Sequence, residues 1–175
     1  MTIPAAIYLV GFMGCGKSTI GRRLADRLGW RFLDLDAEIE AEVGETISAM
    51  FEREGEPYFR AKEAAMLDRI SGEAFTNPGF VLALGGGAFV QPKNRDLLEG
   101  RGVSLWLDVP YQTALRRVRH NPHRPLARDE TRFRALFDQR RPVYALADFH
   151  IPIVSDNPEV TVGSIVKLPL PAWKK

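Results

Sequence analysis

The sequence predicts an α/β fold of three layers, in which a five-stranded parallel sheet is covered by helices on both faces. Short apolar runs that are typical of buried strands alternate with helical patterns along the whole chain. No repeat and no linker divides the 175 residues, which is the size of one domain. Glycine-rich or acidic segments follow three of the strands. In a parallel sheet such segments meet at one edge, where ligands bind.

The expected strands are short runs rich in aliphatic residues, and they cover residues 5–10, 31–34, 80–84, 103–107 and 149–154. The first expected helix carries Ile20, Leu24 and Leu28 on one face and ends at Gly29. Glycine or proline separates most of the later helices from their neighbours. These helices are expected over 37–43, 46–54, 56–70, 93–99, 111–119, 131–141 and 158–166. The many β-branched residues of the last segment lower its helix propensity.

The first strand runs into a phosphate-binding loop. Residues 11–18 read GFMGCGKS and fit the pattern GxxxxGK[ST], with a strand before them and a helix after them. In that setting backbone N–H groups and the positive end of the helix can hold phosphate oxygens. Lys17 is expected to reach the terminal phosphates, and Ser18 is expected to ligate Mg²⁺. The loop therefore predicts binding of a nucleoside triphosphate, and a plain glycine-rich turn is the alternative.

Composition excludes several other classes of protein. The formal net charge of +2 is too small to indicate nucleic-acid binding. No apolar run approaches the ~20 residues of a membrane span, and the first residues lack the pattern of a signal peptide. The single cysteine, Cys15, excludes an internal disulfide framework and suits a reducing cytoplasm. We expect a cytoplasmic protein that binds small molecules.

Two aspartates, Asp34 and Asp36, follow the second strand. If the strand extends through them, its alternation points both carboxylates to the same side, near the phosphate loop. One could help to hold Mg²⁺, and the other could orient or deprotonate a hydroxyl nucleophile. An aspartate that caps the following helix is the alternative. The adjacent phosphate loop favours the chemical interpretation.

Three further segments carry candidate residues. Arg60 and Glu63 lie on one helix face, so Glu63 could fix the guanidinium, although a solvated ion pair is the alternative. Gly85–Gly87 follow the third strand and favour a close approach of the backbone to a ligand, with a flexible turn as the alternative. The arginine-rich segment 116–141 includes a loop with Arg124 that could close over the substrates.

Taken together, these motifs resemble shikimate kinase, and the likeness covers almost the full chain. It is carried by residues 11–25, Asp34-Leu35-Asp36, Phe59-Arg60 with Glu63, Ala83–Gly87, Arg124-Pro125-Leu126 and Arg140–Tyr144. The resemblance implies a P-loop nucleoside monophosphate kinase-like fold and ATP-dependent phosphorylation of the 3-hydroxyl of shikimate, with Mg²⁺. It also implies one domain over 1–175. Its parts would be a core of 1–115 and 142–167, substrate-binding helices at about 36–70 and a lid at about 116–130.

The same resemblance implies a role for each candidate residue. The catalytic residues would be Lys17, Asp36 as the base and Arg124 as the lid arginine. ATP would be bound by Gly14, Cys15, Gly16, Lys17, Ser18, Thr19, Arg117 and Arg124, with Arg117 near adenine. Shikimate would be bound by Asp36, Arg60, Gly85, Gly86, Gly87 and Arg140, and Mg²⁺ by Ser18 and Asp34. Adenine contacts around Asp156–Pro158 stay open. A monomer without nucleic-acid or membrane partners is expected.

Two other functions remain open. A gluconate-type sugar-acid kinase would share the phosphate loop and an anionic, hydroxylated substrate. A nucleotide-binding regulator would keep the fold without phosphoryl transfer, but the retained charged residues, Lys17 and Asp36 among them, argue against it.

The only cysteine allows one chemical expectation. Cys15 lies at the start of a helix, two residues before Lys17, and both features favour the thiolate. A thiol reagent should then modify the free protein faster than the nucleotide-bound protein. Burial of the side chain is the alternative, in which case Cys15 would not react.

Overall fold

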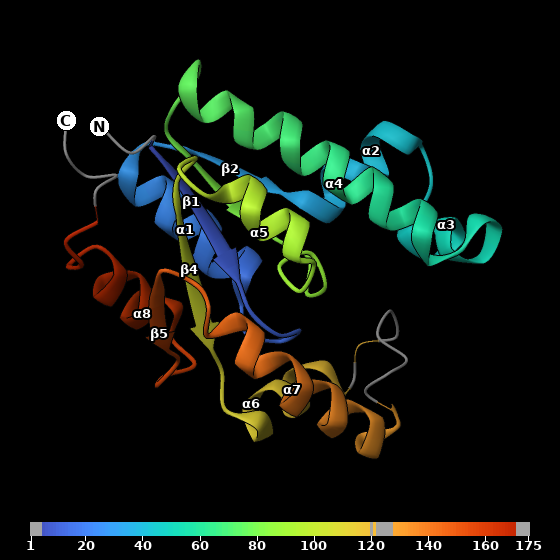
Figure 1. The fold of residues 1–175 in the computed structure, drawn as a ribbon. Coiled ribbons are helices and arrows are strands. Elements are labelled where there is room, and N and C mark those ends of the chain that lie inside the picture. Colours follow the sequence, from blue (N-terminus) through green and yellow to red (C-terminus); the bar gives the residue numbers. More distant parts are fainter. Residues whose placement is uncertain (1–4, 120, 122–127, 171–175) are drawn as a thin grey trace.

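The computed structural model describes residues 5–119, 121 and 128–170. Five strands form one sheet in the order β2-β3-β1-β4-β5, and helices lie on both sides of it (Figure 1). The strands are β1 (Ala6–Val10), β2 (Arg31–Asp34), β3 (Phe80–Ala83), β4 (Val103–Asp108) and β5 (Phe149–Pro152). The three-layer fold with a five-stranded parallel sheet is thereby confirmed.

The central strand β1 is buried along its whole length, as expected for a strand covered on both faces. Its residue Ile7 pairs with Val81 of β3 on one side and with Val103 of β4 on the other. All four strand pairings are parallel. The segments that follow β1, β2 and β3 therefore leave the sheet at the same edge.

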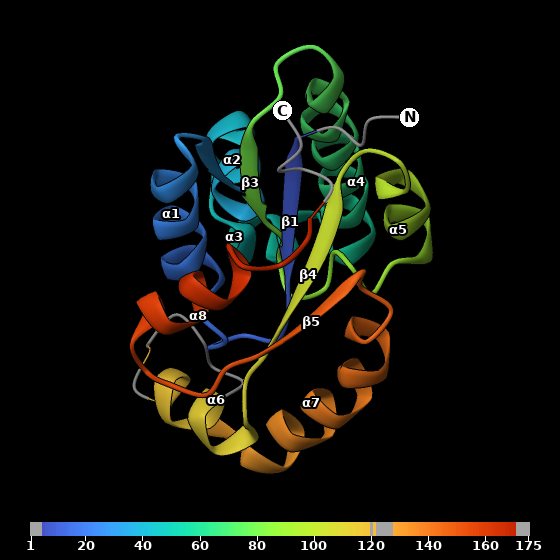
Figure 2. The same ribbon diagram turned by 90° about the vertical axis from the view of Figure 1, so that its left-hand side faces the viewer.

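In the described part of the chain, eight helices and one 3₁₀ turn lie between the strands or, in the case of the last helix, after the last strand. They are α1 (Lys17–Leu28), α2 (Leu35–Val43), α3 (Ile47–Glu54), α4 (Glu56–Gly72), η1 (Glu73–Phe75), α5 (Pro92–Leu98), α6 (Tyr111–Val118), α7 (Glu130–Tyr144) and α8 (Pro158–Ile165). Helices α1 and α8 pack together on one side of the sheet, and α4 and α5 lie on the other (Figures 1 and 2). Helices α6 and α7 lie beyond the carboxyl end of β4.

The described residues include no helix that is long and apolar enough to cross a membrane.

Helix α7 is longer than the sequence predicts. We expected it to end at residue 141, before Pro142, because proline lacks the N–H that continues a helix. The helix instead continues through Pro142 to Tyr144, whose side chain is buried. Packing of the last turn stabilises it against the loss of one backbone hydrogen bond. Arg140 and Tyr144 consequently lie one turn apart on the same helix face.

The other boundaries are closer to expectation. Strand β5 ends at Pro152 rather than at residue 154, and α4 extends to Gly72. The turn η1 lies in the segment between α4 and β3, where the sequence predicts neither a helix nor a strand. The last helix, α8, forms despite its β-branched residues, because Val162 and Ile165 are buried in the core.

Candidate active site

The phosphate loop has backbone angles that favour glycine. Gly14 has φ 82° and Gly16 has φ 95°, both in the left-handed region. A Cβ on Gly14 would also lie 2.9 Å from the carbonyl oxygen of Ala114. Gly16 caps the N-terminus of α1, where unpaired N–H groups gather. The loop and the helix end thus have the form of an anion-binding site.

The two polar side chains of the loop have partners in the structure. Lys17 Nζ donates to Gly11 O at 2.7 Å and to Phe12 O at 3.3 Å. Ser18 Oγ donates to Asp34 Oδ2 at 2.8 Å. The ammonium group is therefore folded over its own loop, within reach of any phosphate bound there.

Asp34 is both a helix cap and a neighbour of the phosphate loop. Its Oδ1 accepts hydrogen bonds from Asp36 N at 3.1 Å and Ala37 N at 3.3 Å, while Oδ2 faces Ser18. The capping alternative is thus confirmed for Asp34, and it does not exclude a metal role. Strand β2 ends at Asp34, as predicted, so the condition that the strand extends through both aspartates is not met, and Asp36 lies in the first turn of α2.

A cavity of about 160 Å³ lies between the phosphate loop and the glycine triplet Gly85–Gly87. Its lining comes from the loop, the ends of β2 and β3, the start of α2, and α7. The lining residues are Met13, Lys17, Ser18, Asp34, Asp36, Ala83, Leu84, Gly85, Gly86, Gly87 and Arg140. The cavity brings together residues that the sequence predicts for phosphate, metal and substrate binding.

Each glycine of the triplet faces a different charged side chain. The pairs are Gly85 with Asp36, Gly86 with Arg140 and Gly87 with Arg60. In these pairs a Cβ would lie 2.6, 3.1 and 2.4 Å, respectively, from the nearest side-chain oxygen or nitrogen. None of the three has a positive φ, so lack of space, and not backbone conformation, requires glycine. The alternative of a plain flexible turn does not account for these three contacts.

Arg60 is held by an ion pair with Glu63, and the Glu63 side chain is buried. Arg60 Nη1 lies 2.8 Å from Glu63 Oε1, and the Glu63 side chain is 1% exposed. Burial raises the pKa of Glu63 even though the Arg60 charge opposes it. Burial, the largest single influence, lowers the pKa of Arg60, but the hydrogen bonds and charges of Glu63 and Glu56 together outweigh it and leave that pKa raised. The alternative of a solvated pair is wrong for Glu63.

A second cavity, of about 320 Å³, adjoins the other side of the phosphate loop. Arg117 crosses it, with Nη1 donating to Gly14 O at 3.0 Å and Nη2 donating to Asp156 Oδ1 at 2.9 Å. The hydrogen bond from Arg117 lowers the pKa of Asp156. The lining residues are Gly16, Thr19, Ile20, Arg117, Ile153, Ser155, Asp156, Pro158 and Thr161. Residues 156–158, for which the sequence left adenine contacts undecided, therefore lie beside Thr19 and Arg117.

Cys15 is fully buried beneath the phosphate loop. Its Sγ lies 3.7 Å from Lys17 Nζ, and a Cβ on Gly11 would approach it to 2.9 Å. The expectation of an accessible thiol is wrong, and the alternative of burial is confirmed.

The lid arginine, Arg124, lies outside the described residues, as do residue 120 and the rest of 122–127. The proposed lid at 116–130 therefore stays a prediction. Its first residues, up to Val118, belong to helix α6, and Glu130 begins α7.

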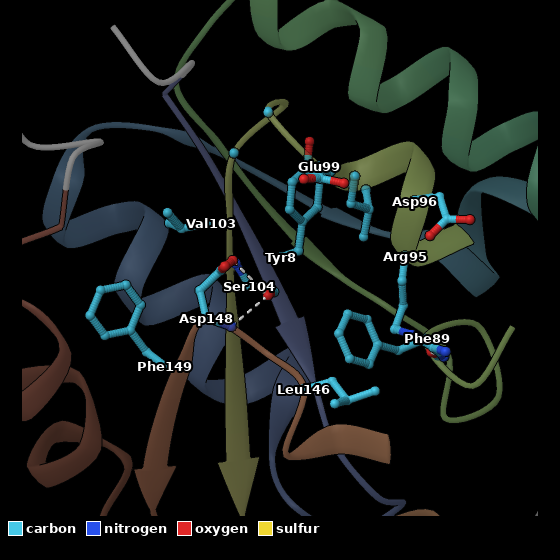
Figure 3. Close-up of a pocket in the computed structure, with 13 residues that line it drawn as sticks. Tyr8, Phe89, Arg95, Asp96, Glu99, Val103, Ser104, Leu146, Asp148 and Phe149 are labelled. Carbon is cyan, nitrogen blue, oxygen red and sulfur yellow. Dashed lines mark hydrogen bonds between the residues drawn. The ribbon is translucent and has the colours of Figure 1, made fainter. Parts of the chain in front are cut away.

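A third cavity, of about 620 Å³, lies beside the amino ends of β4 and β5, and the sequence did not indicate it (Figure 3). Asp148 Oδ2 there accepts from Ser104 N at 2.7 Å and from Ser104 Oγ at 2.8 Å. Tyr8 lines the same cavity and donates through its hydroxyl to Arg101 O at 2.9 Å. No residue of the phosphate loop or of the glycine triplet contributes to its wall.

Sequence reasoning also assigned no role to Tyr144. Its hydroxyl donates to Gly86 O at 2.5 Å. Burial raises the pKa of Tyr144 to about 12, against the opposing charge of Arg140. The only sequence signal was the motif RxPxY that starts at Arg140. This motif contributes to the family resemblance, but it does not indicate which group Tyr144 contacts.

Comparison with known proteins adds a family to this geometry. The family model described as "Shikimate kinase" matches residues 13–168. A shikimate kinase of Halorhodospira halophila is 48% identical over 144 residues, which are 81% of this chain and 79% of the relative. A shikimate kinase of Persephonella marina is 39% identical and covers 91% of this chain and 96% of its own. The solved structure of shikimate kinase from Acinetobacter baumannii in complex with shikimate is 39% identical, with a TM-score of 0.84. It covers 94% of this chain and 92% of its own.

Proposed function

The chain belongs to the shikimate kinase family, and we propose that its residues hold ATP and shikimate in two adjoining halves of one site. The protein is a phosphotransferase that phosphorylates shikimate with ATP. The transfer is to the 3-hydroxyl group of shikimate, which gives shikimate 3-phosphate and ADP. The observation that carries the assignment of residues is the glycine triplet, in which each glycine faces Asp36, Arg140 or Arg60 beside the phosphate loop.

The acceptor half suits a small anion with several hydroxyl groups. Guanidinium groups bind carboxylates through two parallel hydrogen bonds, and Arg60 and Arg140 both reach the triplet. Glu63 fixes the pose of Arg60. The carboxylate of Asp36 is the acceptor for a substrate hydroxyl, and the N–H groups of Gly85–Gly87 donate to substrate oxygens. Shikimate, with one carboxylate and three hydroxyls, matches this set.

The nucleotide half binds the phosphates of ATP through the loop Gly14–Thr19 and the N-terminus of α1. Lys17 leaves the carbonyls of Gly11 and Phe12 and meets the terminal phosphates. The cavity crossed by Arg117 takes the adenine, with Asp156 holding the guanidinium in place.

Ser18 and Asp34 fit a bound Mg²⁺, because one hydroxyl and one carboxylate already lie 2.8 Å apart beside the loop. In the described part of the chain no three His, Cys, Asp or Glu side chains form a metal cage. A magnesium ion here would take its other ligands from water and the substrate phosphates, as is usual for this ion. When bound, it supplies positive charge to the phosphates.

Catalysis in this proposal consists of positioning and of stabilising charge. Asp36 accepts the proton of the attacking hydroxyl while a new P–O bond forms and the bond to the β-phosphate oxygen of ADP breaks. Lys17 stabilises the charge that develops on the transferred group. From the sequence alone, Arg124 is proposed to add a second positive charge from a lid. We further propose that the enzyme acts as a cytoplasmic monomer, and its only cysteine, which is buried and unpaired, suits a reducing cytoplasm.

A coupled assay of ADP release tests the function against its alternatives. Shikimate, gluconate and no acceptor are compared at saturating MgATP. Shikimate-dependent ADP release is expected, with gluconate equal to the no-acceptor background. Release that depends on gluconate instead would favour the sugar-acid kinase, and absence of release with either acceptor would favour the regulator. The family assignment favours neither alternative.

A further inference from the structure

The carbonyl groups of the glycine triplet are all engaged within the protein. Gly85 O accepts from Ala88 N at 3.1 Å, and Gly87 O accepts from Val90 N at 3.2 Å. Both of these bonds are local turns. Gly86 O accepts instead from the hydroxyl of Tyr144, 58 residues away in the sequence. One bond from α7 therefore fixes the middle of the triplet.

The N–H groups of the triplet are available to a ligand. Among the described residues, no backbone or side-chain group accepts a hydrogen bond from the N–H of Gly85, Gly86 or Gly87. The carbonyl of Gly86 and the N–H of Gly87 belong to the same peptide unit. In a trans peptide these two groups point in opposite directions. A bond that holds Gly86 O toward Tyr144 thus also fixes the direction of the Gly87 N–H.

The glycine backbone of the triplet needs a restraint such as the hydrogen bond from Tyr144. A backbone without Cβ atoms has access to many conformations, and a peptide between two glycines rotates with little steric resistance. Side chains cannot restrain the triplet, because the charged groups of Asp36, Arg60 and Arg140 occupy the space where Cβ atoms would lie. The restraint therefore has to come from outside the triplet.

Tyr144 is well suited to supply that restraint. Its side chain is 1% exposed, so its ring is held by packing. A tyrosine hydroxyl keeps its proton at neutral pH, and burial raises the pKa of Tyr144 further, to about 12, so the hydroxyl is a donor to the carbonyl. It lies one helical turn from Arg140, which contacts the same glycine.

We propose that Tyr144 is a positioning residue for the acceptor substrate. It orients the Gly86–Gly87 peptide so that the Gly87 N–H meets an oxygen of shikimate, and it ties that peptide to the helix that carries Arg140. The proposal rests on the acceptor half described under the proposed function. It is separate from ATP binding, since Tyr144 does not line the nucleotide cavity.

The test compares Tyr144→Phe with Tyr8→Phe. Tyr8 is a matched control, because it is also a buried tyrosine that donates to a backbone carbonyl, but it lies at the third cavity (Figure 3). Tyr144→Phe should raise the KM for shikimate by about 10-fold or more, since a displacement of ~1 Å at a site can cost ~100-fold. The KM for ATP should stay within about 2-fold. Tyr8→Phe should change neither constant, and thermal unfolding shows whether both variants are folded in the assay.

Three results would overturn the proposal. One is kinetics of Tyr144→Phe equal to those of Tyr8→Phe, and another is a parallel rise of both KM values. The third uses only the wild type and so does not depend on folding of a variant. Shikimate should slow hydrogen exchange at the Gly87 amide, and an unchanged exchange rate contradicts the proposal. A wild-type protein that releases no ADP with shikimate would contradict the proposed function itself.

Discussion

The nucleotide half and the acceptor half of the site are built in different ways. The phosphate loop is one contiguous stretch, Gly11–Ser18, whose shape is set by glycine angles and by the start of α1. The acceptor half collects single residues from α2, α4, α7 and the loop after β3. A contiguous motif can be recognised from sequence without any fold. A dispersed set depends on the fold, and each of its contacts can be changed by a separate substitution.

This difference predicts that most substitutions in the acceptor half affect shikimate and leave ATP unchanged. The opposite holds for the phosphate loop. The predictions below test that separation, from the largest expected effect to the smallest.

Asp36→Asn should cut kcat by about 10²–10⁴-fold, which is the usual contribution of a general base. Asparagine keeps the size of the side chain beside Gly85 but cannot accept the proton. Binding of ATP, measured by titration calorimetry, should be nearly unchanged. A variant with near-normal kcat would remove Asp36 from the catalytic role, and loss of ATP binding would mean that the two halves are not separate.

Arg140→Lys and Arg60→Lys should each raise the KM for shikimate by about 10-fold or more, because lysine keeps the charge but loses the planar fork. The KM for ATP should change little in both variants. Steady-state kinetics with each substrate varied in turn gives the two constants. Arg134→Lys on the exposed face of α7 is the control, since Arg134 contacts Asp138 and the ring of Tyr111 at the surface, away from the acceptor half. An effect on ATP alone would mean that the arginine belongs to the nucleotide half.

Glu63 makes the acceptor half sensitive to pH. Burial raises its pKa above the ordinary 4.5, so on acidification it gains its proton earlier than an exposed glutamate. Neutral Glu63 no longer holds the Arg60 charge, and Asp36 and Arg140, which also face Glu63, keep their places. On acidification the KM for shikimate should therefore begin to rise, by a few-fold, at a higher pH than the protonation of an exposed glutamate would explain. The KM for ATP should stay unchanged over the same pH range.

Glu63→Gln should remove that pH dependence, while Glu56→Gln should keep it. Glu56 is the matched control because it also contacts Arg60, at 3.3 Å, but is exposed. The effect on stability has the opposite direction. Because the pKa of Glu63 is raised in the folded state, Glu63 contributes stability at acidic pH, and this contribution is lost as pH rises through the folded pKa. Identical pH profiles in both variants would contradict the role of Glu63.

Treatment with a thiol reagent, which would target Cys15, should have the smallest effect. Because its side chain is buried, a thiol reagent should leave the native protein unmodified both with and without MgADP, and should react only after unfolding. Timed alkylation followed by mass spectrometry measures this. Rapid modification of the free protein would mean that the loop opens in solution.

The sequence predicted the parallel sheet and the phosphate loop because both rest on local patterns. It also placed Asp36, Arg60 and Arg140 in one site, since the family resemblance supplied the spatial relation. It did not predict that these three side chains occupy the missing Cβ positions of the triplet, because those contacts join residues up to 54 positions apart and exist only in the fold.

Two errors have local causes. The sequence predicts a helix that ends at residue 141, but burial of Tyr144 extends α7 through Pro142. The conditional idea that strand alternation extends through Asp36 fails, because the cap formed by Asp34 ends β2 and begins α2. In both cases tertiary packing or capping decided a boundary that propensity alone could not.

Titration calorimetry of two ligands on two variants tests the separation of the halves most directly. Shikimate and ADP are each titrated into Lys17→Met and into Arg140→Lys, with the wild type as reference. Lys17→Met should lose affinity for ADP and keep that for shikimate, and Arg140→Lys should do the reverse. Loss of both ligands to a similar degree in either variant would contradict two separately built halves.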